Sequence, residues 1–248
     1  LYYADRLMEF PAGVIGVALS TILLPNLSKS FSKRKTADYS ELINWGLRFG
    51  ILIAVPAATA LAILAVPLIS TLFYYGVFTK TDIVMTQYAL IAYSIGLVGL
   101  ILIKILAPAF YAQQNVKTPV KIALFTLFCT QFMNLIFIGY LKHAGLALAI
   151  GLGACINAGL LFHHLKKGKV FKLNPGWFMF LIKIFFAAFI MALGLFYFKG
   201  TIDLWINYSA FSRFTHLITL ILFGSMVYFI ILKICKLNIT DFFKKTIQ

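Results

Sequence analysis

The chain has 248 residues, of which 62% are apolar and only 12% are charged, and its 22 Lys and Arg residues outnumber 7 Asp and Glu residues to give a formal net charge of +15. A soluble domain of this size is usually about a quarter charged and roughly half apolar. The composition therefore excludes a soluble enzyme, a disordered chain and a basic protein with a nucleic acid as its partner, and it predicts an all-α, polytopic transmembrane helix bundle.

Seven apolar segments follow one another along the chain, each long enough to cross a bilayer as a helix of about 20 residues. They run over residues 2–27, 43–75, 83–111, 118–141, 144–165, 177–198 and 211–235. The second segment is long for one span and contains Pro56 and Pro67, so we expect a kinked or tilted helix there. The first five segments form one predicted unit, residues 1–172, and the last two form a second, residues 173–248.

Basic residues alternate between the two ends of these predicted spans. The loop after the first segment carries four of them, Lys29, Lys33, Arg34 and Lys35, whereas the next loop carries only Lys80. Loops and helix ends account in this way for every basic residue, Arg213 included, except Arg6 and Lys104. Because Lys-rich and Arg-rich loops stay in the cytoplasm, the first helix is predicted to start outside and the C-terminus to lie in the cytoplasm.

Three charged residues lie close together near the start of the first segment, in the stretch YYADRLMEFPAGVIG. At 100° per residue, Asp5, Arg6 and Glu9 share one face of a helix. A charge inside a span usually faces a water-filled cavity or a partner, and an Arg guanidinium binds phosphate in a bidentate manner. This arc therefore favours an anion-binding interior. The alternative is a helix end at the outer headgroups, where three charges cost little.

Lys104 is the second basic residue within an apolar run, in GLVGLILIKILAPAFYAQ. It stands about seven residues from the predicted cytoplasmic end, so its amine could reach that interface by snorkelling. The other interpretation is that Lys104 lines the same cavity as Arg6. No His, Cys, Asp or Glu spacing in the sequence is typical of a metal site or a catalytic group, so we expect neither enzyme activity nor a bound metal or cofactor.

The stretch KIFFAAFIMALGLFYFKG is apolar on all faces, which is typical of a helix that contacts lipid or another apolar surface. Two interpretations follow from this composition. The segment is either an ordinary lipid-exposed helix or, together with the last helix, one wall of a groove for an acyl or isoprenoid chain.

Four stretches are distinctive: YADRLMEFPAGVIGVALSTILLPNLSKSF, TQYALIAYSIGLVGLILIKILAPAFYAQQNVKTPVKIA, MNLIFIGYLKHAGLALAIGLGACINAGLL and NPGWFMFL. They closely resemble the MurJ (MviN) family of bacterial lipid II flippases, and the resemblance extends over nearly the whole chain. The resemblance implies the C-terminal half, helices eight to fourteen, of a fourteen-helix exporter of the multidrug/oligosaccharidyl-lipid/polysaccharide (MOP) superfamily. It also implies a location in the bacterial cytoplasmic (inner) membrane.

The same resemblance implies a site and a substrate. In the family, the ADRLxE motif places a functionally essential Arg in the central cavity beside acidic residues, here Arg6 with Asp5 and Glu9. With Lys104, these residues form the predicted substrate-binding set. The family's last two helices form a hydrophobic groove that leads to the cavity, which favours the groove interpretation of the Phe-rich segment.

The implied activity is the flipping of lipid II, the undecaprenyl-diphosphate-linked peptidoglycan precursor, from the inner to the outer leaflet by alternating access. Its implied partners are lipid II, membrane lipids and the missing N-terminal lobe of the same protein, with membrane potential or a coupled ion as the drive. Two alternatives stay open. One is another MOP-superfamily transporter, such as an O-antigen-type lipid-oligosaccharide flippase or a drug antiporter. The other is a membrane enzyme acting on polyprenyl phosphates, against which the scattered acidic residues argue.

Overall fold

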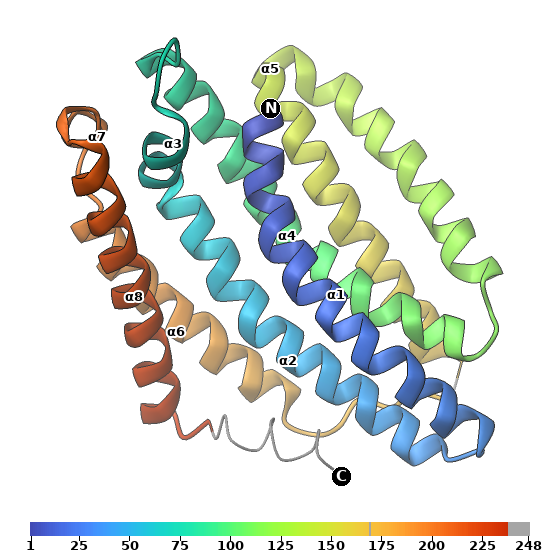
Figure 1. Cartoon of the computed structure of the whole chain (residues 1–248). Coiled ribbons are helices and arrows are strands. Elements are labelled where there is room, and N and C mark those ends of the chain that lie inside the picture. The colour runs from blue at the N-terminus through green and yellow to red at the C-terminus, as the bar shows by residue number, and fades with distance from the viewer. Residues whose placement is uncertain (169, 238–248) are drawn as a thin grey trace.

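The computed structural model describes residues 1–168 and 170–237, and over this part of the chain the regular elements are all helices (Figure 1). In chain order they are α1 (Tyr2–Ser32), α2 (Thr36–Ile63), α3 (Ala65–Phe73), α4 (Lys80–Ala112), α5 (Lys117–Lys167), α6 (Trp177–Phe198), α7 (Ile202–Asn207) and α8 (Ala210–Ile234). All except α3 and α7 are long and apolar enough to cross a membrane. The predicted polytopic transmembrane helix bundle is confirmed.

The long helix α5 is a hairpin of two antiparallel arms, which Figure 1 shows turning back at one end of the molecule. The turn is at Lys142, whose backbone is non-helical (φ 49°, ψ −128°). Beyond the turn, a Cβ added to Gly145 would lie 2.5 Å from the carbonyl oxygen of Phe137. Further along, the amide of Asn157 donates to the hydroxyl of Thr126 at 3.2 Å. The predicted segments 118–141 and 144–165 are therefore two separate spans.

The single predicted segment 43–75 is two helices, and its bend is at Leu64 (φ −88°, ψ 16°). Pro67 is the third residue of α3. The N–H groups in the first turn of a helix have no intrahelical acceptor, so the N–H that proline lacks costs no hydrogen bond at this position. By contrast, α2 passes through Pro56 without a break. Pro56 removes the N–H that would bond to the carbonyl of Leu52, and the hydroxyl of Tyr228 in α8 donates to that carbonyl at 2.9 Å instead. A contact from another helix thus satisfies the proline-freed carbonyl.

The same arrangement recurs in α4, which also continues through its proline, Pro108. The carbonyl four residues earlier belongs to Lys104, and the hydroxyl of Ser20 in α1 donates a hydrogen bond to it. This bond joins the middle of α1 to α4 at the level of Lys104.

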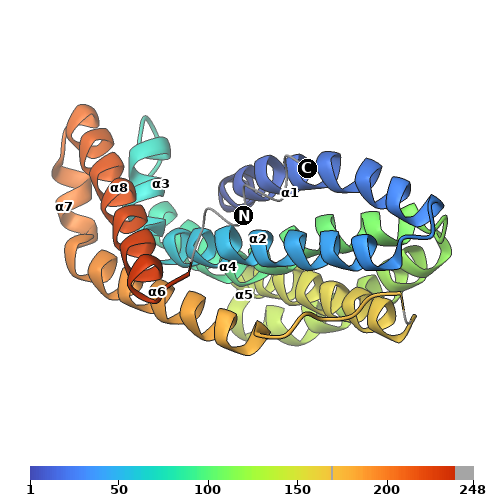
Figure 2. The ribbon, with the colours of Figure 1, turned by 90° about the horizontal axis from the view of Figure 1, so that it is seen from below.

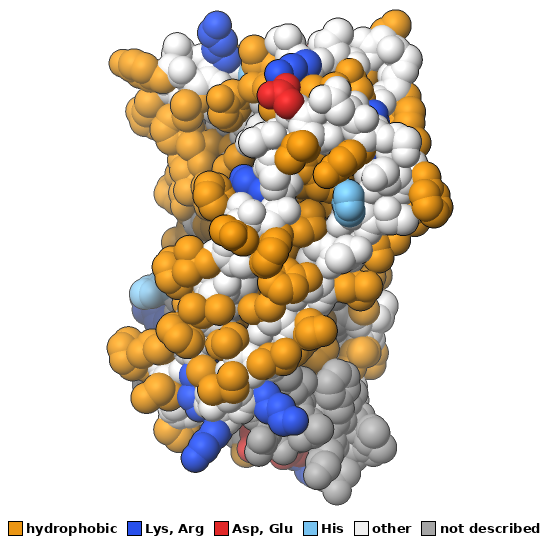
Figure 3. Space-filling view, turned by 90° about the vertical axis from the view of Figure 1, so that its left-hand side faces the viewer, with side chains coloured by type: hydrophobic (Ala, Val, Ile, Leu, Met, Phe, Trp, Pro, Cys, Tyr) orange, Lys and Arg blue, Asp and Glu red, His pale blue; other side chains and the backbone are white. Residues whose placement is uncertain are grey.

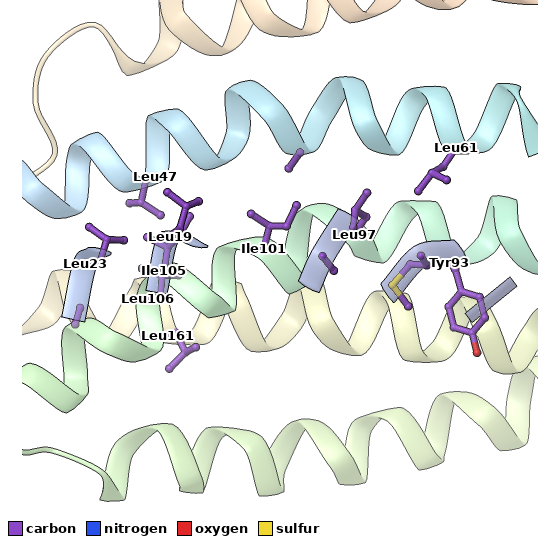
Figure 4. Packing of buried hydrophobic residues seen from close by; sticks show 14 of the residues in the cluster. Leu19, Leu23, Leu47, Leu61, Tyr93, Leu97, Ile101, Ile105, Leu106 and Leu161 are labelled. Atoms are coloured by element: carbon purple, nitrogen blue, oxygen red, sulfur yellow. The ribbon is translucent and has the colours of Figure 1, made fainter. Parts of the chain in front are cut away.

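Helix α4 is the centre of the α1–α5 bundle, with α1 and α2 on one side and the arms of α5 on the other (Figure 2). Leu19, Leu23, Leu47, Leu97 and Ile101 fill the space between these helices (Figure 4). On the other side of α4, a Cβ added to Gly96 would overlap the backbone of Gly151 in α5. Small residues let membrane helices approach to backbone contact, and here they bring the backbone of α5 against the backbone of α4.

Helices α6 and α8 pack on each other and on α2, and they form a second cluster of buried apolar residues. Leu52 and Val55 of α2 contribute to this cluster, together with Ile184, Met191 and Leu217. The predicted division into residues 1–172 and 173–248 stays a prediction. The face that carries α7 and α8 is largely apolar over its middle, and most of its Lys and Arg side chains lie towards the ends (Figure 3).

The basic loops gather at one end of the bundle. The turns between α1 and α2, between α4 and α5, and between α5 and α6 all lie there, as does the end of α8 (Figure 1). The N-terminus, the α3–α4 connection, the α5 turn and α7 lie at the opposite end. We call these the lysine-rich end and the opposite end. Lys169, Lys244 and Lys245 lie outside the described residues.

Candidate functional site

The predicted charged arc lies in the first three turns of α1, at the opposite end. Arg6 Nη1 donates to Glu9 Oε2 at 2.7 Å, and the two side chains are 59% and 53% exposed. The Arg6 guanidinium also lies 5.1 Å from the centre of the Tyr2 ring. A guanidinium held by one carboxylate and one aromatic face is oriented, yet it is open on the side where an anion could approach.

Asp5 has a different environment from its two charged neighbours. It is half-buried, beside the face of α1 that packs into the core through Ala4 and Met8. Tyr93 of α4 lies within electrostatic range of both Asp5 and Glu9. The structure therefore brings Asp5, Arg6 and Glu9 together on one helix, with Arg6 and Glu9 directed away from the core.

An aromatic cluster holds the start of α1 in place, and sequence reasoning missed it. The ring of Tyr3 lies 4.6 Å from Phe73 at the end of α3 and 5.5 Å from Phe78 in the loop that follows. The three rings come from segments about 70 residues apart, and no periodic pattern links them. They anchor the first turn of α1, and hence the charged arc, to the α3–α4 connection.

Lys104 lies at a second level, near the middle of α1. Its aliphatic stem crosses Gly16, where an added Cβ would approach Lys104 Cγ to 2.8 Å, and the side chain is exposed. Ten residues separate Gly16 from Arg6, which corresponds to about 15 Å along the helix. The structure therefore places Lys104 and Arg6 along the same helix without bringing them together. Both interpretations of Lys104, that it lines a cavity and that it snorkels to the interface, stay predictions.

The Phe-rich helix α6 exposes much of its aromatic surface, including Phe178 (78%) and Phe196 (66%). On its other side, an apolar cavity of about 280 Å³ lies between α2, α6 and α8. Leu52, Met191 and Leu220 are among its lining residues. The cavity shows that α6 and α8 leave an apolar gap against α2, which is where a groove for a chain-like ligand would run.

A family model described as "Lipid II flippase MurJ" matches residues 1–242. The chain belongs to the MurJ family. The resemblance seen in the sequence is thereby confirmed.

Several curated MurJ proteins are similar to the chain. A lipid II flippase MurJ from Burkholderia cenocepacia is 52% identical over 190 residues, which are 77% of this chain and 37% of the relative. A probable lipid II flippase MurJ from Buchnera aphidicola subsp. Schizaphis graminum is 42% identical over 250 residues, which are 100% of this chain and 48% of the relative. The chain therefore spans about half the length, or less, of these MurJ relatives.

A solved MurJ structure has the same arrangement of helices. It is described as lipid II flippase MurJ in an inward closed conformation, and it superposes with a TM-score of 0.77 at 25% sequence identity. The match covers 99% of this chain and 47% of the solved MurJ chain. The fold described above is thus the fold of about half of a MurJ protein.

The sequence did not reveal the place of Arg213. It was predicted to be a loop charge that sets orientation, but it is only 7% exposed. Its guanidinium donates to the carbonyls of Ser70 at 3.2 Å, Tyr74 at 3.1 Å and Ile206 at 3.3 Å, and its Nε donates to Tyr208 at 3.0 Å. Arg213 thereby ties α8 to α3 and α7.

A second tie lies nearby, where the amine of Lys80 at the start of α4 pairs with the carboxylate of Asp203 in α7. Both side chains are more than half exposed, so this pair contributes little stability by itself. Spacing predicts neither the Lys80–Asp203 pair nor the bond from Arg213 to Ser70, because these partners lie more than 100 residues apart.

Proposed function

We propose that the protein of which this chain forms about half flips lipid II from the inner to the outer leaflet of the bacterial cytoplasmic membrane, as a transporter and not as an enzyme. The observation that carries the proposal is the oriented Arg6–Glu9 pair near the start of the membrane helix α1, in a chain whose relatives are named lipid II flippases. The charge on such a helix is costly unless a ligand or a watery cavity uses it.

In this proposal, Arg6 binds the diphosphate of the substrate. The Arg6–Glu9 pair is largely exposed, and solvent-exposed pairs contribute little stability. A diphosphate offers the guanidinium two parallel, charge-assisted hydrogen bonds, which are stronger. The incoming headgroup could therefore replace Glu9 as the partner of Arg6. On release of the headgroup, Glu9 would pair with Arg6 again. Asp5 would offset part of the positive charge of Arg6, so that the product would not be retained.

The undecaprenyl chain of the substrate needs an apolar path. We assign it to the membrane and to the gap between α2, α6 and α8, which apolar residues of all three helices line. Lys104, one level further along α1, is the second proposed contact for the headgroup.

The orientation and the drive are part of the proposal. With the lysine-rich end in the cytoplasm, as the positive-inside rule favours, Arg6 lies towards the outer side. A charge that moves across the membrane gains about 2.3 kcal/mol per 100 mV, which would bias an alternating-access cycle. Membrane potential or a coupled ion is therefore the proposed source of energy.

A chimera tests the role of Arg6. This chain would replace the matching half of the Buchnera aphidicola relative, because that relative aligns with the whole of this chain. Lipid II translocation by the chimera would then be measured in proteoliposomes. We expect Arg6→Gln to reduce translocation more than about tenfold, since hydrogen bonds to charged groups contribute about 1.5–3 kcal/mol. Arg6→Lys should be intermediate, because Lys keeps the charge but lacks the planar fork.

The matched control is Lys33→Gln, which removes one positive charge from the exposed turn after α1. This variant should translocate lipid II at the rate of the unmodified chimera. Normal translocation by Arg6→Gln would show that Arg6 does not bind the diphosphate.

A further inference from the structure

A polar cavity lies at the lysine-rich end, far from the charged arc. Its volume is about 970 Å³, and it is lined by the end of α1, the α1–α2 turn, the end of α4 and the loop after α5. Its size is near the upper end of the range for ligand pockets, about 300–1,000 Å³. It is therefore large enough for a headgroup of several rings, and not only for a single phosphate ion.

The charge of this cavity is positive. Lys29, in the last turn of α1, and Arg34, in the turn that follows, both line it. Among the described residues, none of those that line it is an Asp or a Glu. An anion would thus meet two cations here without a competing carboxylate.

The remaining walls suit a sugar. Ser32, Gln113 and Gln114 supply hydroxyl and amide groups, and Tyr111 supplies an aromatic face. One wall is held rigid by a chain of hydrogen bonds in which Gln113 donates to the hydroxyl of Tyr39 at 2.7 Å. That hydroxyl donates in turn to the carbonyl of Ala109 at 2.6 Å. A fixed wall lowers the ordering cost of binding.

The position of the cavity relative to the other cations completes the argument. Lys29 is 23 residues beyond Arg6 on α1, which corresponds to about 35 Å. Lys104 crosses α1 between them, at Gly16. Cationic side chains therefore occur at three levels of α1, near its two ends and near its middle.

We propose that this cavity binds the sugar diphosphate headgroup of the substrate at the lysine-rich end, before the headgroup reaches Lys104 and Arg6. The proposal rests on the proposed function for the identity of the substrate. The chemistry that it assigns to the cavity, recognition of a diphosphate by Lys29 and Arg34 and of a sugar by the amides, is testable by itself.

The test uses the chimera with the Buchnera aphidicola relative, purified in detergent, because the described residues that line the cavity are all present in it. The probe is uridine diphosphate N-acetylglucosamine, a soluble sugar diphosphate, and binding is measured by titration calorimetry. The test variant combines Lys29→Gln with Arg34→Asn, because Arg34 has φ +55° and Asn tolerates that conformation. We expect an affinity loss of about thirtyfold, which equals about 2 kcal/mol at 1.4 kcal/mol per factor of ten.

The matched control combines Lys33→Gln with Lys167→Gln, which removes the same charge from the same end but outside the cavity. It should change the affinity no more than about twofold, because exposed charges at a distance are screened. A failure of the cavity is distinguishable from a failure of the proposed role of Arg6, because the first is measured as probe binding by the cavity pair and the second as lipid II translocation by Arg6→Gln.

A second variant, Gln114→Gly, removes an amide while keeping the positive φ of +57° that glycine adopts freely. It should weaken binding of the sugar diphosphate but not of inorganic diphosphate. The proposal is overturned if the sugar diphosphate does not bind, or if the control pair loses as much affinity as the cavity pair. Tighter binding of a short-chain phosphatidylglycerol, lost in the cavity pair, would also overturn it, since the cavity would then be a phospholipid site.

Discussion

The hydrogen bond from Tyr228 to the carbonyl of Leu52 offers a sharp test of how this bundle tolerates proline. Tyr228 is 1% exposed and Leu52 is 3% exposed, so the bond lies in the interior between α2 and α8. Tyr228→Phe keeps the ring and removes only the donor. The carbonyl freed by Pro56 then has lost both its helical partner and its substitute.

The expected cost follows from the burial. Leaving a buried acceptor without a partner costs about 1–3 kcal/mol, whereas interhelical hydrogen bonds in membrane proteins average about 0.6 and reach about 1.7 kcal/mol. We therefore expect Tyr228→Phe to destabilise the chain by about 1–2 kcal/mol. For a chain of this size, each kcal/mol lowers the melting temperature by about 2–4 °C.

The Pro56→Ala background makes the prediction specific, because it restores a backbone N–H to the carbonyl of Leu52. There Tyr228→Phe should cost clearly less, with a coupling energy of about 1 kcal/mol between the two positions. The assay is thermal unfolding in detergent, followed by circular dichroism, for the four combinations of the two positions. Tyr197→Phe, at a tyrosine that is 81% exposed, is the control and should have no effect. Equal costs of Tyr228→Phe in both backgrounds would refute the reasoning.

Two further predictions use the same assay. Gly96→Ala should destabilise the chain by about 1–3 kcal/mol, because the new methyl group overlaps the backbone of Gly151. Gly159→Ala, where an added Cβ meets nothing within 4 Å, should be close to neutral; equal effects of the two would show that α4 and α5 are not in backbone contact. Arg213→Met keeps much of the buried volume but leaves several carbonyls without their charged donor, so we expect a loss of at least about 3 kcal/mol. Lys80→Met breaks an exposed pair and should cost less than about 1 kcal/mol, and the reverse order would contradict the assignment of Arg213 as the principal tie.

The geometry of part of the candidate site was predictable because its contacts are local. Arg6 and Glu9 are three residues apart, so helix geometry alone places them on one face, and the pair at 2.7 Å follows. Lys104 was recognised as unusual by its charge. Its place over Gly16, however, depends on how α4 crosses α1, which the pattern of either helix leaves open. The aromatic cluster around Tyr3 and the basic cavity at Lys29 were missed for the same reason.

The sequence by itself determined the class of the protein, the positions of its spans and the separation of its charge. Each of these depends on a local property, since a membrane helix must satisfy its own backbone hydrogen bonds and remain apolar over about 20 residues. Only the tertiary structure decided where the chain bends. The break is at Leu64, while the helices continue through Pro56 and Pro108, and side chains from other helices bond to the carbonyls that those two prolines free. The burial of Arg213 was decided in the same way, since its acceptors come from segments far apart in the chain and meet only when the bundle is packed.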